Sequence, residues 1–538
     1  MSLLPFVGVT IAGALVTLAL HRRRTAGSVA GLVSVAASLL ALVLATPGDP
    51  LLVGGGALAL TDYARIFLGV GLAGGLAVLT ISRLATWEAM GPATLLVATA
   101  GLGLGLGIAG ALPGLLLAGT AATLAGTVAL AHPATPVRVR ALARELRGAT
   151  VATTVGLIAV GLVPEEIGGL AVQPQVAGLA AVAAGLALGH RLGAIPLHAR
   201  VARLTDAAPA STLPTLLVLL PAGWAVVVLG WAPDTLGPAA PVLGWDGTLL
   251  VLIGLTTLVL GTFAALIQDD LLRIVAYTVV LDAGVVVLGY SSLDPIGREA
   301  VRAWIVPFLA SRTALVGWVI AFRAAFATTH LSEARGWLRR APALGVALAG
   351  IGVATVGWPG FLVWDARLEA LQASTAGPAF LVASLASLGA AIAVARILGT
   401  GFGRPEPRVM AAAGELTRVP AGLRAAARAF RAPDGRRGAA VRAATHEARP
   451  LLELNRTPLR ALLVVMLAGL ALMSAAGAFG IREAAAQPDI PIPVPSVPPP
   501  DLLPVVIPSQ EPDVPLEESP APEASPPPDP EPSGTPAA

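Results

Sequence analysis

The sequence predicts an all-α integral membrane protein with about 14 transmembrane helices. Three observations support this fold class: a hydrophobic share of 55%, only 12% charged residues, and apolar runs of membrane-spanning length along most of the 538 residues. Water cannot solvate a chain of this composition on both sides of its helices. Short runs of alternating polar and apolar residues are absent, so helices and not a β-barrel are expected to satisfy the backbone polar groups in lipid.

The predicted spans follow from length. A hydrocarbon core of roughly 30 Å needs about 20 apolar residues per helix. The first run is followed by His21 and three arginines with no small-residue cleavage site, so we interpret it as a retained span and not a signal peptide. The predicted spans lie near residues 4–20, 28–46, 63–83, 92–111, 112–131, 149–164, 174–190, 210–231, 247–267, 271–290, 301–323, 342–364, 378–398 and 459–480.

Composition divides the chain into four parts. Residues 1–399 form the predicted transmembrane bundle of 13 spans, and residues 459–480 form the last transmembrane helix. Residues 400–458 are rich in Arg and Ala, which predicts a cytoplasmic loop, either solvated or forming short interfacial helices on anionic lipid. Residues 481–538 alternate proline with acidic residues and predict a disordered extracytoplasmic tail.

The arginines between the spans predict the orientation, because basic residues are retained on the cytoplasmic side of a membrane. With fourteen spans the basic loops all fall on one face, and both termini are then extracytoplasmic. We therefore expect a multi-pass protein of a bacterial-type plasma membrane. The basic segments are 22–24, 138–147, 200–203, 335–340 and 404–456.

Several chemistries are not expected from this chain. It has no cysteine, which excludes thiolate metal sites, iron–sulfur ligation and disulfides. It has no Walker A sequence and no Gly-rich nucleotide turn, so ATP-driven transport is not expected. We predict no metal site, no cofactor bound by the chain and no nucleic-acid partner.

Polar residues inside the spans are the informative positions, since ionisable groups at membrane depth are costly and usually mark an ion path or a buried pair. The segment from His190 reads HRLGAIPLHARVARLTDAAPAS. Pro196 interrupts or ends the seventh helix there and leaves backbone carbonyls free for a polar pathway. A broken helix beside charges is typical of transporters.

This segment resembles the signature of the antiporter-like membrane subunits of respiratory complex I and of multisubunit cation/proton antiporters. In that family a basic residue lies five positions before a Pro-Phe/Leu-His triplet, and an Ala-Pro turn follows. A second resemblance is the run from Gln268 to Thr278, which is similar to the family's Gln-x-x-Leu-Lys-Arg-x-x-Ala-Tyr-Ser run, and 357–361 resembles a Gly-x-Pro-x-x-Gly-Phe element more loosely. The matching residues are Arg191, Pro196, Leu197, His198, Pro209, Gln268, Arg273 and Tyr277.

The resemblance implies a fold and an activity. The implied fold is antiporter-like, with two inverted five-helix repeats and broken helices. Members of the family are thought to move protons along water and ionisable side chains, with a glutamate in the fifth span setting the protonation of a lysine in the seventh. The positions that correspond to these residues are about Thr120 for the glutamate, Arg191 for the lysine, Leu272 for a further lysine and Arg312 for one in a later span.

The chain departs from this pattern because it contains no lysine. A desolvated lysine can lose its proton, whereas an arginine effectively never does. We hypothesise that Asp282 is a protonatable site biased by Arg191 or Arg312. The alternative is a buried Asp–Arg pair that holds two helices in register. His198 either relays protons or caps backbone carbonyls at the helix break.

Two interpretations remain open from the sequence. The first is a divergent subunit of a proton-translocating NADH-quinone oxidoreductase or related complex, with quinone and NADH handled by partner subunits and at most a non-redox role for this chain. The second is a non-conducting structural or assembly subunit of such a complex. A third, more distant interpretation is an independent carrier for a small solute or lipid. A hydrated polar line joining Arg191, Asp282 and Arg312 would favour the first. The expected partners are the bilayer and other membrane subunits.

Overall fold

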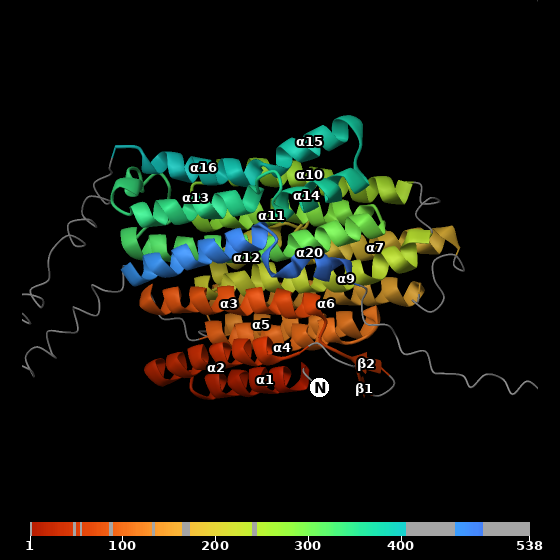
Figure 1. The fold of residues 1–538 in the computed structure, drawn as a ribbon, viewed down its shortest axis with the longest axis horizontal. Coiled ribbons are helices and arrows are strands. Elements are labelled where there is room, and N and C mark those ends of the chain that lie inside the picture. The colour runs from red at the N-terminus through yellow and green to blue at the C-terminus, as the bar shows by residue number, and fades with distance from the viewer. Residues whose placement is uncertain are drawn as a thin grey trace, which may run out of the picture. The chain divides into compact units, whose positions relative to one another are not determined.

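Long helices that lie side by side make up most of the described structure (Figure 1). The computed structural model describes residues 3–46, 50–53, 56–85, 90–131, 135–163, 173–238, 245–404 and 458–487. These all belong to a unit of residues Met1–Pro493, and the second unit, Val494–Ala538, lies outside the described residues. Residues 405–457 of the predicted loop 400–458 also lie outside them.

The first half of the chain forms helices α1 to α8 and one short β-hairpin. The hairpin β1–β2 between α2 and α3 pairs Leu51 with Leu58 in antiparallel register and was not predicted. Its strands are too short to show an alternating pattern. The elements are α1 (Leu3–Ala19), α2 (Arg24–Leu44), β1 (Leu51–Val53), β2 (Gly56–Leu58), α3 (Asp62–Ala85), α4 (Gly91–Gly107), α5 (Ala111–Ala131), α6 (Pro136–Leu162), α7 (Pro174–Leu192) and α8 (Ala199–Ala207).

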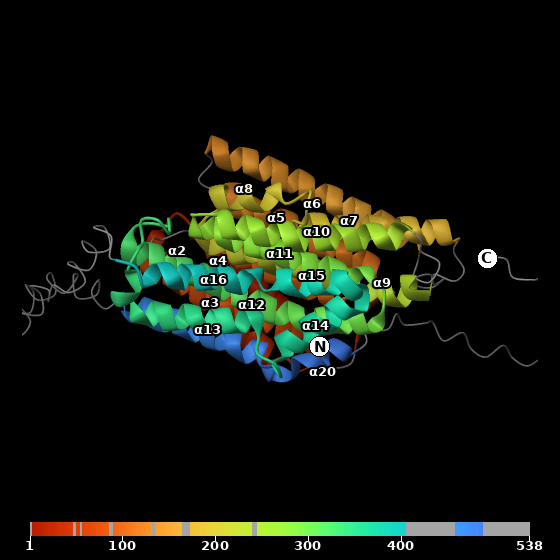
Figure 2. The same cartoon turned by 90° about the horizontal axis from the view of Figure 1, so that it is seen from above.

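The second half continues the bundle, with α11 and α12 at its centre (Figure 2). The α12 helix contains Pro307 and is almost fully buried along its length. The elements are η2 (Ala210–Thr212), the π-helical turn η3 (Pro214–Leu219), α9 (Leu220–Leu236), α10 (Trp245–Ile267), α11 (Leu271–Ser291), α12 (Pro295–Phe326), η5 (Trp337–Arg339), α13 (Pro342–Val356), α14 (Leu362–Ser374), α15 (Gly377–Ser387), α16 (Gly389–Gly401), the helix Pro458–Ala475, η7 (Ala478–Gly480) and α20 (Ile481–Ala486).

The prediction of a helical membrane protein is confirmed. Among the described residues, eleven helices are long and apolar enough to cross a membrane, and the shorter apolar helices are α1, α4 and α13. Together they would give the predicted number of spans. The count of fourteen itself stays a prediction, as does the division into two inverted repeats.

The predicted break after the seventh span lies between α7 and α8. Gly193 ends α7 in a left-handed conformation, with φ 83°, which a residue with a side chain rarely adopts. Pro196 follows and lacks the N–H that a continuing helix would need. Residues 193–198 therefore leave the last carbonyls of α7 without helical partners.

A second break separates α13 from α14, at the segment that loosely resembles the family's glycine and proline element. Gly357 and Gly360 both have positive φ, 76° and 91°, and Pro359 lies between them. This geometry ends α13 at Val356 and allows α14 to begin at Leu362. The bundle thus contains two broken helices, as the resemblance implied.

Two predicted boundaries were wrong. The basic segment 138–147 is not a loop, because α6 begins at Pro136 and Thr135 accepts a hydrogen bond from the Arg138 N–H at 3.3 Å. The predicted tail also begins too early, since 481–486 forms the short helix α20. Arg482 of α20 donates a hydrogen bond to Glu369, and this bond raises the pKa of Arg482.

Glycine allows α10 and α11 to approach closely. A Cβ atom at Gly284 would lie 2.7 Å from the Leu258 backbone nitrogen, and one at Gly261 would lie 2.8 Å from that of Leu281. Small residues at such contacts bring helix backbones together within a membrane.

We expect Gly284→Ala to separate α10 from α11 and to lower stability by about 1–3 kcal/mol, the usual cost of overpacking a filled interior. Gly247→Ala on α10 is the matched control, because a methyl group there meets no atom within 4 Å. Thermal unfolding of the two purified variants in detergent measures the difference. Equal melting temperatures would contradict this account of the packing.

Candidate functional site

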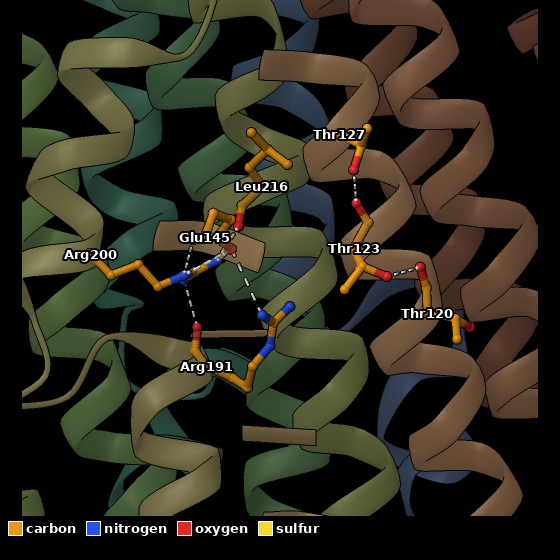
Figure 3. A network of polar contacts seen from close by, with 7 residues as sticks. All are labelled: Thr120, Thr123, Thr127, Glu145, Arg191, Arg200 and Leu216. Carbon is orange, nitrogen blue, oxygen red and sulfur yellow. Dashed lines mark hydrogen bonds and ion pairs between the residues drawn. The ribbon is translucent and has the colours of Figure 1, made fainter. Parts of the chain in front are cut away.

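The first buried centre is an ion-pair cluster at the break between α7 and α8 (Figure 3). Glu145 of α6 accepts hydrogen bonds from Arg200 of α8, from Nε at 2.8 Å to Oε2 and from Nη2 at 2.7 Å to Oε1. Nη1 of Arg191, on α7, lies 3.8 Å from the same carboxylate. All three side chains are at most 6% exposed. One carboxylate thus faces two guanidinium groups away from solvent.

Arg200 also binds backbone carbonyls that irregular structure leaves free. Its Nη1 donates to the carbonyl of Arg191 at 2.7 Å, near the end of α7. Its Nη2 donates to the carbonyl of Leu216 at 3.2 Å, within the π-helical turn η3. Both acceptors are available because the helical hydrogen-bond ladder is interrupted there. Arg200 therefore joins α6, α7 and η3 at one point.

Arg191 differs from Arg200 in its surroundings. Its side chain is 1% exposed, yet Nε, Nη1 and Nη2 have no hydrogen-bond partner among the described residues. A buried cation with unmet donors is costly. Such groups are normally satisfied by ordered water. Arg191 is therefore a position where the bundle needs water.

The second buried centre lies between α11, α12 and the break of α13 and α14. Arg312 donates from Nε to Oδ2 of Asp282 and from Nη1 to the Thr355 hydroxyl at 3.1 Å. Asp282 and Arg312 are 5% and 2% exposed. The predicted Asp–Arg pair is therefore present. Whether Asp282 takes up a proton stays a prediction.

Arg367 completes the second centre from α14. It is buried, its charge interacts with that of Asp282, and its Nη2 donates to the Val356 carbonyl at 2.8 Å. Its guanidinium carbon lies 5.3 Å from the centre of the Trp364 ring. Val356 is the last residue of α13, so this carbonyl is also one that a helix break leaves free.

The two centres share one design. Each has a carboxylate on an unbroken helix, Glu145 or Asp282, and two arginines near it. In each, an arginine that follows the break bonds to a carbonyl at the end of the preceding helix half, Arg200 in one and Arg367 in the other. Local interruptions of the backbone are thus stabilised by the same cations that neutralise the carboxylates.

The structure brings together some of the predicted site residues and not others. Arg191 pairs with Glu145, whereas Asp282 pairs with Arg312, so direct contacts among the described residues do not join these into one line. His198 is half-buried at the start of α8, and its ring lies 6.4 Å from that of Tyr277.

The remaining motif residues have structural contacts. Arg273 donates to the carboxylate of Asp206 at 3.3 Å. The Gln268 carbonyl accepts from Arg396 at 2.6 Å. Pro196 lies exposed in the break, and Pro209 is the buried residue before η2.

Thr120, the position assigned to the family's glutamate, is not among the side chains that pair with Arg191 in the described structure. It lies exposed on α5, and its hydroxyl donates to the Leu117 carbonyl at 2.8 Å. Glu145, on the next helix, is the carboxylate beside Arg191 (Figure 3). Glu145 and Arg200 were not predicted as site residues, because both lie in arginine-rich segments that the hydropathy pattern places outside the membrane. A signal was available: Glu145 is the one acidic residue among four arginines in 138–147.

The fold and the buried charges define a multi-pass membrane protein with broken helices and paired ionisable groups inside its bundle. The family model described as NADH:quinone oxidoreductase/Mrp antiporter, TM, matches residues 174–393. This range contains both helix breaks and the second centre, together with Arg191 and Arg200. The resemblance that the motifs predicted is confirmed.

Relatives of known identity match parts of the chain. The NADH-quinone oxidoreductase subunit N of Nitrosomonas europaea is 27% identical over 199 residues, 37% of this chain and 40% of that protein. The same subunit of Halorhodospira halophila is 25% identical over 267 residues, 49% of this chain and 53% of that protein. The chain therefore spans about two fifths to one half of the length of these curated relatives.

Solved structures show the same fold over most of the chain. A chain of respiratory complex I from Thermus thermophilus with bound NADH has a TM-score of 0.63 at 18% identity, covering 88% of this chain and 100% of that one. A chain of the Mrp complex from Dietzia sp. DQ12-45-1b has a TM-score of 0.62 at 18% identity, covering 90% and 99%. The protein has the antiporter-like fold.

The first centre predicts a strong coupling between Glu145 and Arg200. Glu145→Leu leaves two buried guanidinium groups without a counter-charge and should cost about 3–5 kcal/mol of stability. Glu145→Leu combined with Arg200→Leu should recover part of that loss. A double-mutant cycle by chemical unfolding in detergent measures the coupling.

The exposed pair Asp206 and Arg273 provides the control cycle. Both of its side chains are about half exposed, so the coupling there should be only about 0–1 kcal/mol. Equal coupling energies for the two pairs would show that burial does not strengthen the interaction between Glu145 and Arg200.

Proposed function

We propose that the protein is a divergent antiporter-like membrane subunit of a proton-translocating NADH-quinone oxidoreductase or a related complex, and that it contributes to proton or cation translocation. The family match and the fold of complex I and Mrp chains support this proposal. The site adds chemical support, because titratable carboxylates lie inside the bundle beside fixed positive charges.

The observation that carries the proposal is the buried Arg191 with unmet hydrogen-bond donors. Its guanidinium lies 3.8 Å from Glu145 and has no hydrogen-bond partner among the described residues. A side chain serving only to hold helices together would be expected to use its donors, as Arg200 does. A buried cation that needs water, next to a carboxylate, is the arrangement that a hydrated ion path requires.

The roles of the two residue types follow from their chemistry. Arginine keeps its charge at all physiological pH values, so it can bias a path but not carry the proton. The carboxylates of Glu145 and Asp282 can take up and release a proton. In this lysine-free chain they are the proposed carriers, and Arg191, Arg200, Arg312 and Arg367 set their charge balance.

The same proposal implies which partners surround the chain and which membrane it occupies. Other membrane subunits would be the partners, and quinone and NADH would be handled by partner subunits and not by this chain. Its membrane would be a bacterial-type plasma membrane, with both termini extracytoplasmic, as the alternating arginines indicate.

A second candidate function is a non-conducting structural or assembly subunit. The observation that favours it is that Arg200 donates hydrogen bonds to both oxygens of Glu145 and to two backbone carbonyls. A carboxylate held in this way is well suited to fixing helices in place. Proton flux distinguishes the two candidates.

The test begins with purification of a tagged copy from its native membrane in mild detergent, with mass spectrometry of the proteins that accompany it. Quinone oxidoreductase or antiporter subunits should co-purify. Asp282→Asn in the reconstituted complex should then lower proton flux by about 10²–10⁴-fold, the usual worth of a positioned acid–base group.

Asp234→Asn is the matched control, because Asp234 is 64% exposed and pairs with Arg298 away from both centres. Its flux should equal that of the wild type. Unchanged flux in Asp282→Asn would remove Asp282 from the path. Recovery of the chain without such partners would contradict the proposed assembly.

A further inference from the structure

A small cavity adjoins Glu145, and its lining residues come from α6, α7 and α8. It leaves about 20 Å³ for solvent and is lined by Arg144, Glu145, Gly148, His190, Arg200 and Arg203, among others. A volume of roughly 10–15 Å³ is enough for one water molecule. The cavity is therefore large enough for a water molecule that contacts the carboxylate.

His190 supplies the imidazole among the side chains that line the cavity. Its Nδ1 is buried and has no hydrogen-bond partner among the described residues. Its Nε2 packs against α6, where a Cβ atom at position 148 would lie only 2.7 Å away. Glycine at that position is what allows the imidazole to reach the cavity. A water molecule in the cavity would supply the kind of partner that buried ring nitrogens normally have.

The charges that face His190 come from three helices. They are Arg144 and Glu145 on α6, Arg191 on α7, and Arg200 and Arg203 on α8. The four arginines keep their protons. Only Glu145 and His190 in this group can change charge, and imidazole is the side chain whose unperturbed titration lies nearest neutral pH. The exposed Arg144 and Arg203 border the cavity toward solvent.

We propose that His190 passes protons between solvent and Glu145 through a water molecule in this cavity, an inference that rests on the proposed function. Protonated His190 gives its proton to the water, which gives one of its own to the Glu145 carboxylate. His190 ends neutral and Glu145 ends as the neutral acid. The loss of its negative charge weakens the ion pairs to Arg191 and Arg200, which frees the carboxyl to pass the proton onward.

The direct test is the titration of His190 in the full-length protein in lipid nanodiscs, followed by NMR of ¹⁵N-labelled histidine. The chain has six histidines, and His190→Gln identifies the resonance. That resonance should change reversibly as the pH is varied through the range in which an imidazole gains and loses its proton. Glu145→Gln should move its midpoint, whereas Gly161→Ala should not. A ring that keeps one protonation state throughout, or a midpoint independent of Glu145, would overturn the inference.

Proton flux of the reconstituted complex gives a second readout. His190→Gln keeps a polar group but cannot titrate, and it should lose about tenfold or more in flux. Imidazole added to His190→Ala should restore part of the flux, with the restored rate following the basicity of substituted imidazoles. A merely structural histidine would not give that dependence.

Glycine variants test the geometry independently of the imidazole itself. Gly148→Ala should push the ring from the cavity and lower flux, and Gly161→Ala on the same helix meets no atom within 4 Å and should not. Wild-type flux in His190→Gln would overturn the relay and leave the proposed function standing. A wild-type protein without flux would instead contradict the proposed function, and the NMR titration would then decide the role of His190.

Discussion

The structure depends on the neutralisation of buried carboxylates by arginine inside a helix bundle. Removing an ionised side chain from water costs several kcal/mol, and only good geometry with further hydrogen bonds offsets that cost. Arg200 meets this condition, because it bonds to both oxygens of Glu145 and to two backbone carbonyls. Helix α6, the end of α7, helix α8 and the π-helical turn η3 are held in register by this one guanidinium.

The same constraint explains the two broken helices. A break in a transmembrane helix exposes carbonyls that lipid cannot satisfy, so protein groups must bind them. Arg200 and Arg367 each bind a carbonyl at the end of a helix half and lie near a carboxylate. Each helix break therefore supplies carbonyl acceptors for a buried arginine, and the hydrogen bonds from that arginine stabilise the break.

Sequence analysis predicted the features that depend on local composition. The helical membrane class, the break at Pro196 and the pairing of Asp282 with Arg312 are all present in the structure. These follow from apolar length, from the missing N–H of proline, and from the rule that buried charges are paired. The antiporter-like fold could be predicted because the motifs around Arg191 and Gln268 lie in the spans that correspond to those of the family.

What the sequence did not predict depends on tertiary contacts. Glu145 lies in an arginine-rich stretch that reads as a loop, yet α6 extends through it and buries the carboxylate against Arg200. Mean hydropathy is averaged over a window of residues. It therefore cannot show that one face of the arginine-rich N-terminal part of α6 is buried. Arg367 is buried beside Trp364 and donates to the Val356 carbonyl, which the break between α13 and α14 leaves free. The sequence of a helix break does not show which side chains will bind its free carbonyls, because those side chains come from elsewhere in the fold.

In the proposed function, a buried carboxylate of this bundle carries protons. The most direct measurement compares proton flux driven by an imposed membrane potential in liposomes that contain the complex with either the wild-type chain or Glu145→Gln, with protein-free liposomes as the baseline. We expect wild-type flux above the baseline and its loss in Glu145→Gln, with the variant still folded. Wild-type flux at the baseline, or equal flux in both proteins, would contradict it.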